Sequence, residues 1–271
     1  MAIRALLFDL DNTLLLEDEV TFRAVRTACE RAAGRADPER LYEATLRIAD
    51  DRWRAAPTSA YADRMGIWWG EGLWGEFKGD GDGLRALRDF VPQFRRDVWR
   101  DALADCGVDD ADLAADLDEV YPRARRAGEI VDPEAVAVLD DLSRDHRLAL
   151  VTNGSPDVQR EKLGRAALAH YFAAIVISAE LDVGKPDRRI FAAALDAIGV
   201  PADAAVMIGD SLPRDIGGAR DAGLRSIWID RGDVVSKPDD PMPDARVAAL
   251  SQIRSCLAAW EPDAASPRDS P

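Results

Sequence analysis

Two aspartates follow an apolar run near the start of the chain. Ile3 to Phe8 has the length and aliphatic content of a buried parallel strand, and Asp9 and Asp11 come directly after it. Side chains at i and i+2 of an extended segment share a face, so both acids can reach one reacting centre. Two close carboxylates repel each other unless a cation or a shared proton lies between them. The pair therefore favours a hard divalent cation such as Mg²⁺, although apolar strands also end in Asp-x-Asp-Asn turns without chemical function.

Length, composition and net charge limit the kinds of protein that this chain could be. The chain has 271 residues, 47% hydrophobic content and a formal net charge of −15. This length supports one or two domains with a large core, and the charge argues against nucleic acid and anionic membranes as partners. No apolar run approaches the ~20 residues of a membrane span. Three scattered cysteines indicate a reducing compartment, and no signal peptide is apparent, so we expect a cytoplasmic protein.

The chain divides into segments that differ in their hydrophobic periodicity and composition. Residues 17–128 show helical periodicity without β-branched strand runs and are expected to form an all-helical insert. Residues 1–16 and 129–260 read as alternating strands and helices, which predicts an α/β core with a Rossmann-like, doubly wound parallel sheet. The polar, proline-rich residues 261–271 are expected to be disordered. Because the insert must leave and return near the end of the first strand, we expect it to cover that end as a lid.

Local patterns set further boundaries. We expect separate helices over Leu84–Val91 and Phe94–Cys106, on either side of Pro92. Asp132-Pro133 is typical of an N-cap with proline at the first helical position. Ile216–Ala222 is expected to be a helix, and Ser236–Asp244 a loop before the last helix.

Four polar clusters follow successive predicted strands. They are Asp9-x-Asp11, Thr152-Asn153-Gly154, Gly184-Lys185-Pro186 and Gly209-Asp210-x4-Asp215. Each alone is an ordinary turn sequence. In a parallel sheet, however, all four would meet at the carboxyl edge, where open α/β sheets bind ligands. Lys185, one of four lysines in the chain, would then supply the positive charge that an anionic substrate needs.

This ordered set resembles the haloacid dehalogenase superfamily, in the phosphatase branch with a helical cap between its first and second motifs. The resemblance implies a Mg²⁺-dependent phosphatase of a small phosphorylated metabolite that works through an aspartyl-phosphate. It makes Asp9 the nucleophile and Asp11 the general acid and base. It also implies a phosphate-binding role for Asn12, Thr152, Asn153 and Lys185, of which Thr152 and Lys185 are catalytic as well. The implied metal ligands are Asp9, Asp11 (through its carbonyl), Asp210 and Asp215.

Alternatives within and outside the superfamily stay open. A 2-haloacid dehalogenase needs no acid two residues after its nucleophile, because halide leaves unprotonated, so Asp11 favours phosphate. A phosphomutase would keep the same core motifs. A non-enzymatic binding protein with this fold would ordinarily have lost Asp9 or a metal acid. The C-x5-R pattern at Cys29 falls late in an amphipathic helix and does not indicate a cysteine phosphatase.

A glycine-rich stretch in the insert carries three tryptophans. Trp68, Trp69 and Trp74 lie within Met65–Gly83, which holds seven of the nineteen glycines. Such rings most often form core. They are also candidates to contact the organic part of the substrate, and the glycines would permit lid movement.

Overall fold

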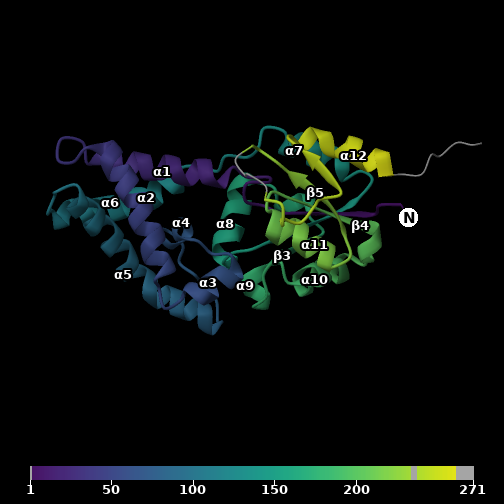
Figure 1. The fold of residues 1–271 in the computed structure, drawn as a ribbon, viewed down its shortest axis with the longest axis horizontal. Coiled ribbons are helices and arrows are strands. Elements are labelled where there is room, and N and C mark those ends of the chain that lie inside the picture. Colours follow the sequence, from purple (N-terminus) through teal and green to yellow (C-terminus); the bar gives the residue numbers. More distant parts are fainter. Residues whose placement is uncertain (1, 233–236, 261–271) are drawn as a thin grey trace, which may run out of the picture.

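The computed structural model describes residues 2–232 and 237–260. The predicted disordered tail, residues 261–271, and Ser236 of the predicted loop lie outside these ranges. The remainder forms a helical part and an α/β part, which lie side by side along the long axis of the molecule (Figure 1).

The α/β part is built on one parallel sheet, as the alternating pattern predicts. Its six strands lie in the order β3-β2-β1-β4-β5-β6, and every neighbouring pair is parallel. The bounds are β1 Ala5–Phe8, β2 Arg147–Thr152, β3 Ala174–Ile177, β4 Ala205–Gly209, β5 Arg225–Ile229 and β6 Ala245–Val247. The short edge strand β6 escaped prediction because three residues are too few to show a strand pattern.

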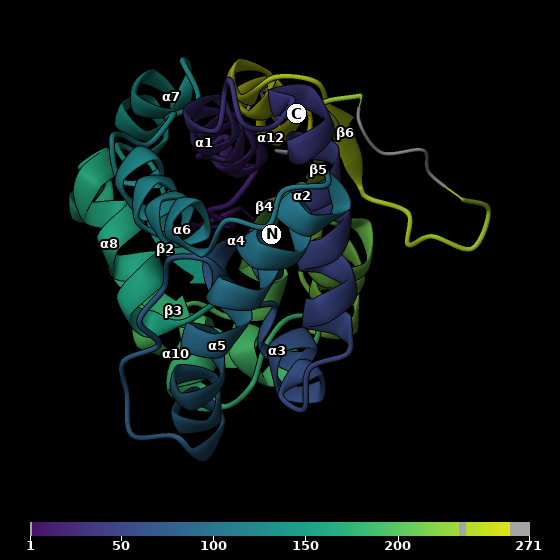
Figure 2. The same ribbon diagram turned by 90° about the vertical axis from the view of Figure 1, so that its left-hand side faces the viewer.

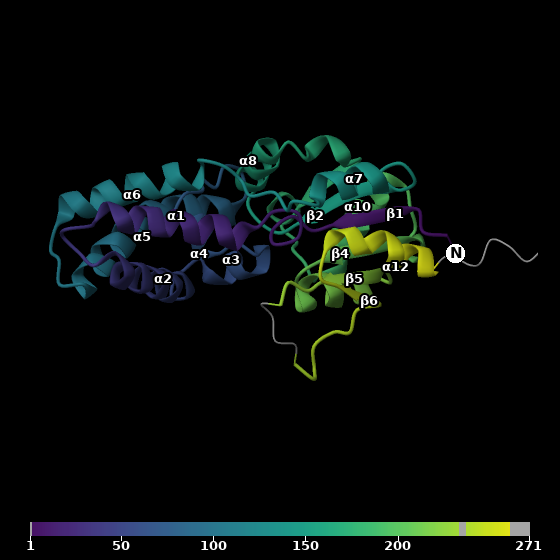
Figure 3. The same ribbon diagram turned by 90° about the horizontal axis from the view of Figure 1, so that it is seen from above.

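Helices cover both faces of the sheet, one layer above the strands and one below (Figure 1), which confirms the doubly wound fold; Figure 3 looks down onto the upper layer. One face packs against α7 (Ala135–Leu142), α8 (Pro156–Ala166) and α12 (Ile253–Trp260). The other packs against α10 (Arg188–Ile198) and α11 (Gly218–Asp221). Short helical turns complete the connections: η1 Ala169–Tyr171, α9 Ser178–Leu181, η2 Ala202–Ala204, η3 Leu212–Gly217 and η4 Leu250–Gln252.

The segment between β1 and α7 is helical, and residues 17–128, all of which the structure describes, contain no strand. Its helices are α1 Glu17–Arg31, α2 Pro38–Arg54, α3 Ser59–Met65, α4 Trp69–Gly72, α5 Asp82–Asp105 and α6 Ala111–Arg125 (Figure 2). They enclose an apolar core of their own that is separate from the two cores flanking the sheet. We refer to residues 17–128 as the helical insert; their standing as a separate domain stays a prediction.

The insert leaves and rejoins the α/β part through two paired segments. Leu16 N donates to Ile130 O at 2.8 Å, and Asp132 N donates to Leu14 O at 2.9 Å. Leu15 and Val131 thereby form an antiparallel bridge. Both crossings therefore lie just beyond β1, so the helices start and end beside Asp9 and Asp11.

Three boundaries differ from prediction. Pro92 does not divide α5, because Leu87, Val91, Phe94 and Val98 keep one buried stripe along a single helix of 24 residues. Asp132 accepts from Glu134 N at 2.8 Å in a turn, and α7 begins later, at Ala135. The segment expected to be a helix over 216–222 is the π-helical η3 followed by α11.

No helix in the described ranges, α5 included, combines the length and the apolar character that a bilayer crossing requires.

Candidate active site

The polar clusters meet where the sheet changes its direction of growth. From β1 the chain adds β2 and β3 on one side and then β4, β5 and β6 on the other. Phe8 pairs in register with both Leu150 and Ile208. The residues after β1, β2 and β4 therefore emerge together, at the topological switch point where α/β sheets bind ligands.

Three carboxylates gather at this edge. One oxygen each from Asp9, Asp210 and Asp215 lies within 4.8 Å of the others. The π-helical η3 turns Asp215 back, so that its Oδ2 accepts from Ser211 N at 3.0 Å. Gly209 leaves the necessary room, since a Cβ there would lie 2.3 Å from the same oxygen. Asp210 is held by Trp228 Nε1, which donates to its carbonyl oxygen at 2.8 Å.

The cluster is short of positive charge. Burial, opposed by Lys185 and reinforced by Asp215, raises the pKa of Asp9 to about 7. Burial and the neighbouring carboxylates raise the pKa of Asp210 well above its usual value. Oxygen ligands crowded in this way suit a hard divalent cation, which would stabilise their ionised forms.

Lys185 is the cation already present. Its Nζ lies 2.6 Å from Asp9 Oδ1 and 2.7 Å from Asp215 Oδ1, and its side chain is buried. Burial opposes its charge, but Asp215 and Asp9 outweigh burial and raise its pKa. Asn153 fixes its backbone from both sides: Lys185 N donates to Asn153 Oδ1 at 2.8 Å, and Asn153 Nδ2 donates to Lys185 O at 3.0 Å.

Asp11 is held from behind by residues that the sequence analysis missed. Lys162 Nζ donates to its two carboxylate oxygens at 3.1 and 3.2 Å, and Gln159 Nε2 donates to Oδ2 at 2.9 Å. Lys162 also donates to Glu71 Oε1 of the insert at 2.9 Å. The sequence offered one indication of Lys162: lysines are scarce in this chain, a fact that the sequence analysis applied only to Lys185.

Thr152 and Asn12 occupy supporting positions. The Thr152 hydroxyl accepts from Gln159 Nε2 at 2.6 Å and is fully buried. Asn12, in a left-handed conformation with φ of 56°, accepts from Asp18 N at 3.1 Å at the start of α1. Asn12 borders the site cavity, whereas Thr152 is not among its lining residues. The phosphate-binding roles of both stay predictions.

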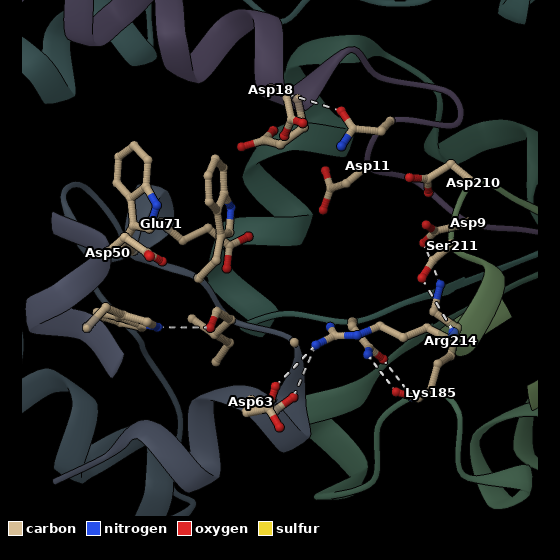
Figure 4. Close-up of a pocket in the computed structure, with 18 of the residues that line it drawn as sticks. Asp9, Asp11, Asp18, Asp50, Asp63, Glu71, Lys185, Asp210, Ser211 and Arg214 are labelled. Atoms are coloured by element: carbon tan, nitrogen blue, oxygen red, sulfur yellow. Dashed lines mark hydrogen bonds and ion pairs between the residues drawn. The ribbon is translucent and has the colours of Figure 1, made fainter. Parts of the chain in front are cut away.

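A cavity of about 630 Å³ lies above the carboxylates, between the sheet edge and the insert. Asp9, Asp210 and Lys185 face it from one side, and Asp50 and Asp63 face it from the insert (Figure 4). Its lining also includes Arg54, Arg214, Trp53, Trp68 and Trp69.

The tryptophan candidates separate into two groups. Trp68 and Trp69 border the cavity and pack edge to face, with ring centroids 4.9 Å apart. Trp74 does not border it: the ring is buried in the insert, with the guanidinium groups of Arg125 and Arg126 each 5.0 Å from it. Nothing in the sequence shows this difference, because it depends on how the short α4 turns the chain.

The structure agrees that Cys29 does not belong to a cysteine-phosphatase site. It is buried in the insert, and burial raises the pKa of its thiol to about 12. A thiol of this kind is a poor nucleophile at neutral pH.

We expect the acidic cluster to make the free energy of unfolding depend on both pH and Mg²⁺. Because the pKa of Asp9 is raised to about 7, stability of the metal-free protein should fall as pH rises through that value. A Mg²⁺ ion at this cluster would compete with the proton, so the rise in melting temperature on adding Mg²⁺ should be larger at about pH 8 than at about pH 5.5.

Differential scanning calorimetry at both pH values checks this expectation. Asp210→Asn should lose most of the Mg²⁺-dependent rise, and the exposed Asp80→Asn should keep it. An equal rise at both pH values, or a full rise in Asp210→Asn, would place the bound ion elsewhere.

Comparison with known proteins identifies the family. The sequence profile of the haloacid dehalogenase-like hydrolases matches residues 3–223. A phosphoserine phosphatase of Thermus thermophilus is 41% identical over 254 residues, covering 93% of this chain and 98% of that protein. An N-acylneuraminate-9-phosphatase of Mus musculus is 33% identical over 170 residues, covering 62% of this chain and 68% of that protein.

Solved structures agree on the fold. A Bacillus subtilis protein described as a HAD hydrolase bound to magnesium shares 22% identity with a TM-score of 0.66, covering 95% of this chain and 99% of that one. A 2-haloacid dehalogenase from Pseudomonas syringae shares 28% identity with a TM-score of 0.58, covering 96% and 100%. The chain therefore belongs to the haloacid dehalogenase-like hydrolases, in their phosphatase branch, as the ordered motifs predict.

Proposed function

We propose that this phosphatase hydrolyses a small phosphorylated metabolite with Mg²⁺, through an aspartyl-phosphate on Asp9. One observation carries the proposal: Asp9 faces the cavity with Lys185 Nζ 2.6 Å away and the Asp210 and Asp215 carboxylates beside it. A carboxylate so placed has a cation to screen an incoming phosphate and an open side for attack.

The donor set suits Mg²⁺. Asp9, Asp210 and Asp215 would hold it, with the carbonyl of Asp11 as a further ligand. Burial and the neighbouring carboxylates raise the pKa values of Asp9 and Asp210 in spite of Lys185, so their ionised forms would be stabilised by a further cation. When bound, the ion would neutralise charge on the phosphoryl group that Asp9 attacks.

In the first half-reaction Asp9 attacks phosphorus in line. A bond forms from its carboxylate oxygen to phosphorus, and the bond from phosphorus to the ester oxygen breaks. The electron pair of the broken bond stays on the ester oxygen, which takes a proton from the carboxylic acid of Asp11. The products are the aspartyl-phosphate, a neutral alcohol and the Asp11 carboxylate.

In the second half-reaction water attacks the same phosphorus. Asp11 takes one proton of the water as its oxygen bonds to phosphorus, and the bond to Asp9 breaks. Asp9 is thereby regenerated as a carboxylate and inorganic phosphate is released. Lys185 and the backbone amide of Asn153, two residues that border the cavity, would hold the phosphoryl oxygens through both steps, and the Thr152 hydroxyl would join them on turning from Gln159 toward the cavity.

The insert would act as a cap that supplies substrate contacts. Side chains of both charges line the cavity, among them Arg54 and Arg214 as cations and Asp50 and Asp63 as anions. Such a mixture suits a zwitterion, with an arginine at its carboxylate and an aspartate at its ammonium group. Together with the similarity to a phosphoserine phosphatase, this supports phosphoserine as the substrate.

Phosphate release from a panel tests the proposal. The panel contains phosphoserine, N-acetylneuraminate 9-phosphate, a pyrimidine 5′-nucleotide and 4-nitrophenyl phosphate, each with Mg²⁺ and with EDTA. We expect Mg²⁺-dependent release, highest kcat/KM on phosphoserine, and none with EDTA. Release unaffected by EDTA would overturn the metal assignment, and a better nucleotide substrate would overturn the assignment of phosphoserine.

Arg214 offers a sharper test of substrate contact. It belongs to the α/β part, borders the cavity and lies 3.5 Å from Asp63 Oδ1 of the insert. If it binds the substrate carboxylate, Arg214→Met should raise KM for phosphoserine about 10- to 100-fold, because charge-assisted hydrogen bonds contribute about 1.5–3 kcal/mol. KM for 4-nitrophenyl phosphate, which has no carboxylate, should change little.

Steady-state kinetics on both substrates check this expectation. The exposed Arg123→Met serves as the matched control and should leave both KM values unchanged. An equal change in KM for the two substrates would show that Arg214 does not recognise the carboxylate.

A further inference from the structure

Asp11 is held by a pair of side chains from one helix. Gln159 and Lys162 are three residues apart on α8, so they share one face of the helix, and both are fully buried. Between them they donate to both carboxylate oxygens of Asp11. The Asp11 side chain keeps 24% exposure and lines the cavity. The Asp11 carboxylate is therefore held by α8 on one side and exposed to the cavity on the other.

Lys162 is itself fixed in place. Its Nζ donates to Glu71 Oε1 at 2.9 Å and lies 3.3 Å from Glu17 Oε2. Arg125, the other cation that bears on it, is 2.6 Å from the same Glu17 oxygen. An ammonium group has three protons, and the carboxylates of Asp11, Glu71 and Glu17 surround it. Such a group is held more rigidly than a lysine with one partner.

We infer that Lys162 is a positioning residue that aims the Asp11 carboxyl group at the leaving oxygen, with Glu71 of the insert anchoring it. This inference rests on the proposed function, in which Asp11 donates the proton. Of the residues assigned to the metal, Lys162 contacts only Asp11, and there it meets the side-chain carboxylate and not the carbonyl oxygen; the side chains of Asp9, Asp210 and Asp215 are not among its partners. Its effect should therefore be felt in proton transfer to the departing alcohol, and not in the attack by Asp9.

Leaving groups of different acidity separate these steps. Serine released from phosphoserine is a very weak acid and must be protonated as it leaves, whereas 4-nitrophenol departs readily as its anion. Phenol is intermediate. General acid catalysis accelerates reactions by about 10²–10⁴-fold. An incorrectly oriented acid should therefore slow the hydrolysis of phosphoserine far more than that of 4-nitrophenyl phosphate. A lysine that only stabilises the fold would affect all three esters alike.

The test compares kcat/KM of wild type and Lys162→Met on phosphoserine, phenyl phosphate and 4-nitrophenyl phosphate. The loss on phosphoserine should exceed that on 4-nitrophenyl phosphate by about tenfold or more, with phenyl phosphate between them. Placed in an Asp11→Asn background, Lys162→Met should add little. The exposed Lys78→Met is the matched control and should leave the ratios unchanged.

Equal losses on the three esters, or a full additional loss in the Asp11→Asn background, would overturn the inference. If Lys162→Met does not fold, the double variant Lys162→Met/Glu71→Gln removes one charge of each sign and carries the same comparison. A wild-type protein that hydrolyses none of the three esters would instead overturn the proposed function. The two failures are thus distinguished by the wild-type measurement.

Discussion

Asp9→Asn should yield a folded protein that releases no phosphate. The asparagine keeps the size of the side chain and can still accept a hydrogen bond from Lys185, which also retains Asp215 as a partner. It cannot attack phosphorus, so we expect turnover to fall by about 10⁴-fold or more, as when other nucleophiles are removed. Phosphate release from phosphoserine and 4-nitrophenyl phosphate, alongside circular dichroism, measures both effects.

The matched control is Asp80→Asn, which removes the same charge from an exposed position. It should retain wild-type activity. Appreciable turnover by Asp9→Asn on either ester would contradict the nucleophile assignment. Loss of the folded signal would mean that Asp9 is needed for structure, and Asp9→Ala, which also relieves the crowded charge, would then repeat the test.

Lys185→Met should lower both activity and stability. The lysine is buried between Asp9 and Asp215, and removing one partner of a buried ion pair costs about 3–5 kcal/mol. The pKa of Asp9, already raised to about 7, should rise further, which leaves less of the nucleophilic carboxylate. We expect activity to fall by about 10³-fold, since electrostatic groups of this kind contribute 10²–10³ or more.

Urea unfolding with and without Mg²⁺ measures the stability effect. Mg²⁺ should recover more free energy of unfolding in Lys185→Met than in the wild type, because the variant carries more uncompensated negative charge. The exposed Lys78→Met should match the wild type. A variant as stable as wild type in EDTA would contradict the view that Lys185 neutralises the cluster.

Much of this edge of the sheet was predictable because three of the four motifs begin where a strand ends, at β1, β2 and β4. Asp9 and Asp210 come immediately after the apolar ends of β1 and β4, and parallel pairing necessarily brings such residues to one edge. Lys185 could be identified equally well from the sequence, because it lies beside a proline in a loop and is one of only four lysines in the chain. Local pattern and sheet geometry together were sufficient here.

The contacts of Asp11 were not predictable in the same way. Lys162 lies inside α8, where a lysine ordinarily faces solvent, and its partner Glu71 lies 91 positions earlier in the insert. Neither residue follows a strand, and no local pattern links them. Their meeting depends on how the insert packs against α8, which is a tertiary property.

Errors in the predicted elements have the same origin. A proline normally ends a helix, yet the buried stripe Leu87, Val91, Phe94 and Val98 carries α5 through Pro92. The strand β6 exists because it pairs with β5, with Ile227 opposite Ala245. In both cases packing overrides the local preference.

The central claim is that Asp9 carries the phosphoryl group. Asp11→Asn offers the most direct test, because 4-nitrophenol needs no protonation to leave but hydrolysis of the intermediate needs the base. Asp11→Asn protein is mixed with 4-nitrophenyl phosphate and Mg²⁺, acid-quenched, reduced with borohydride and mapped by mass spectrometry. The account predicts homoserine at position 9, dependent on substrate. If 4-nitrophenol is released but homoserine appears at the position of another aspartate, or at no position, the result would contradict the account.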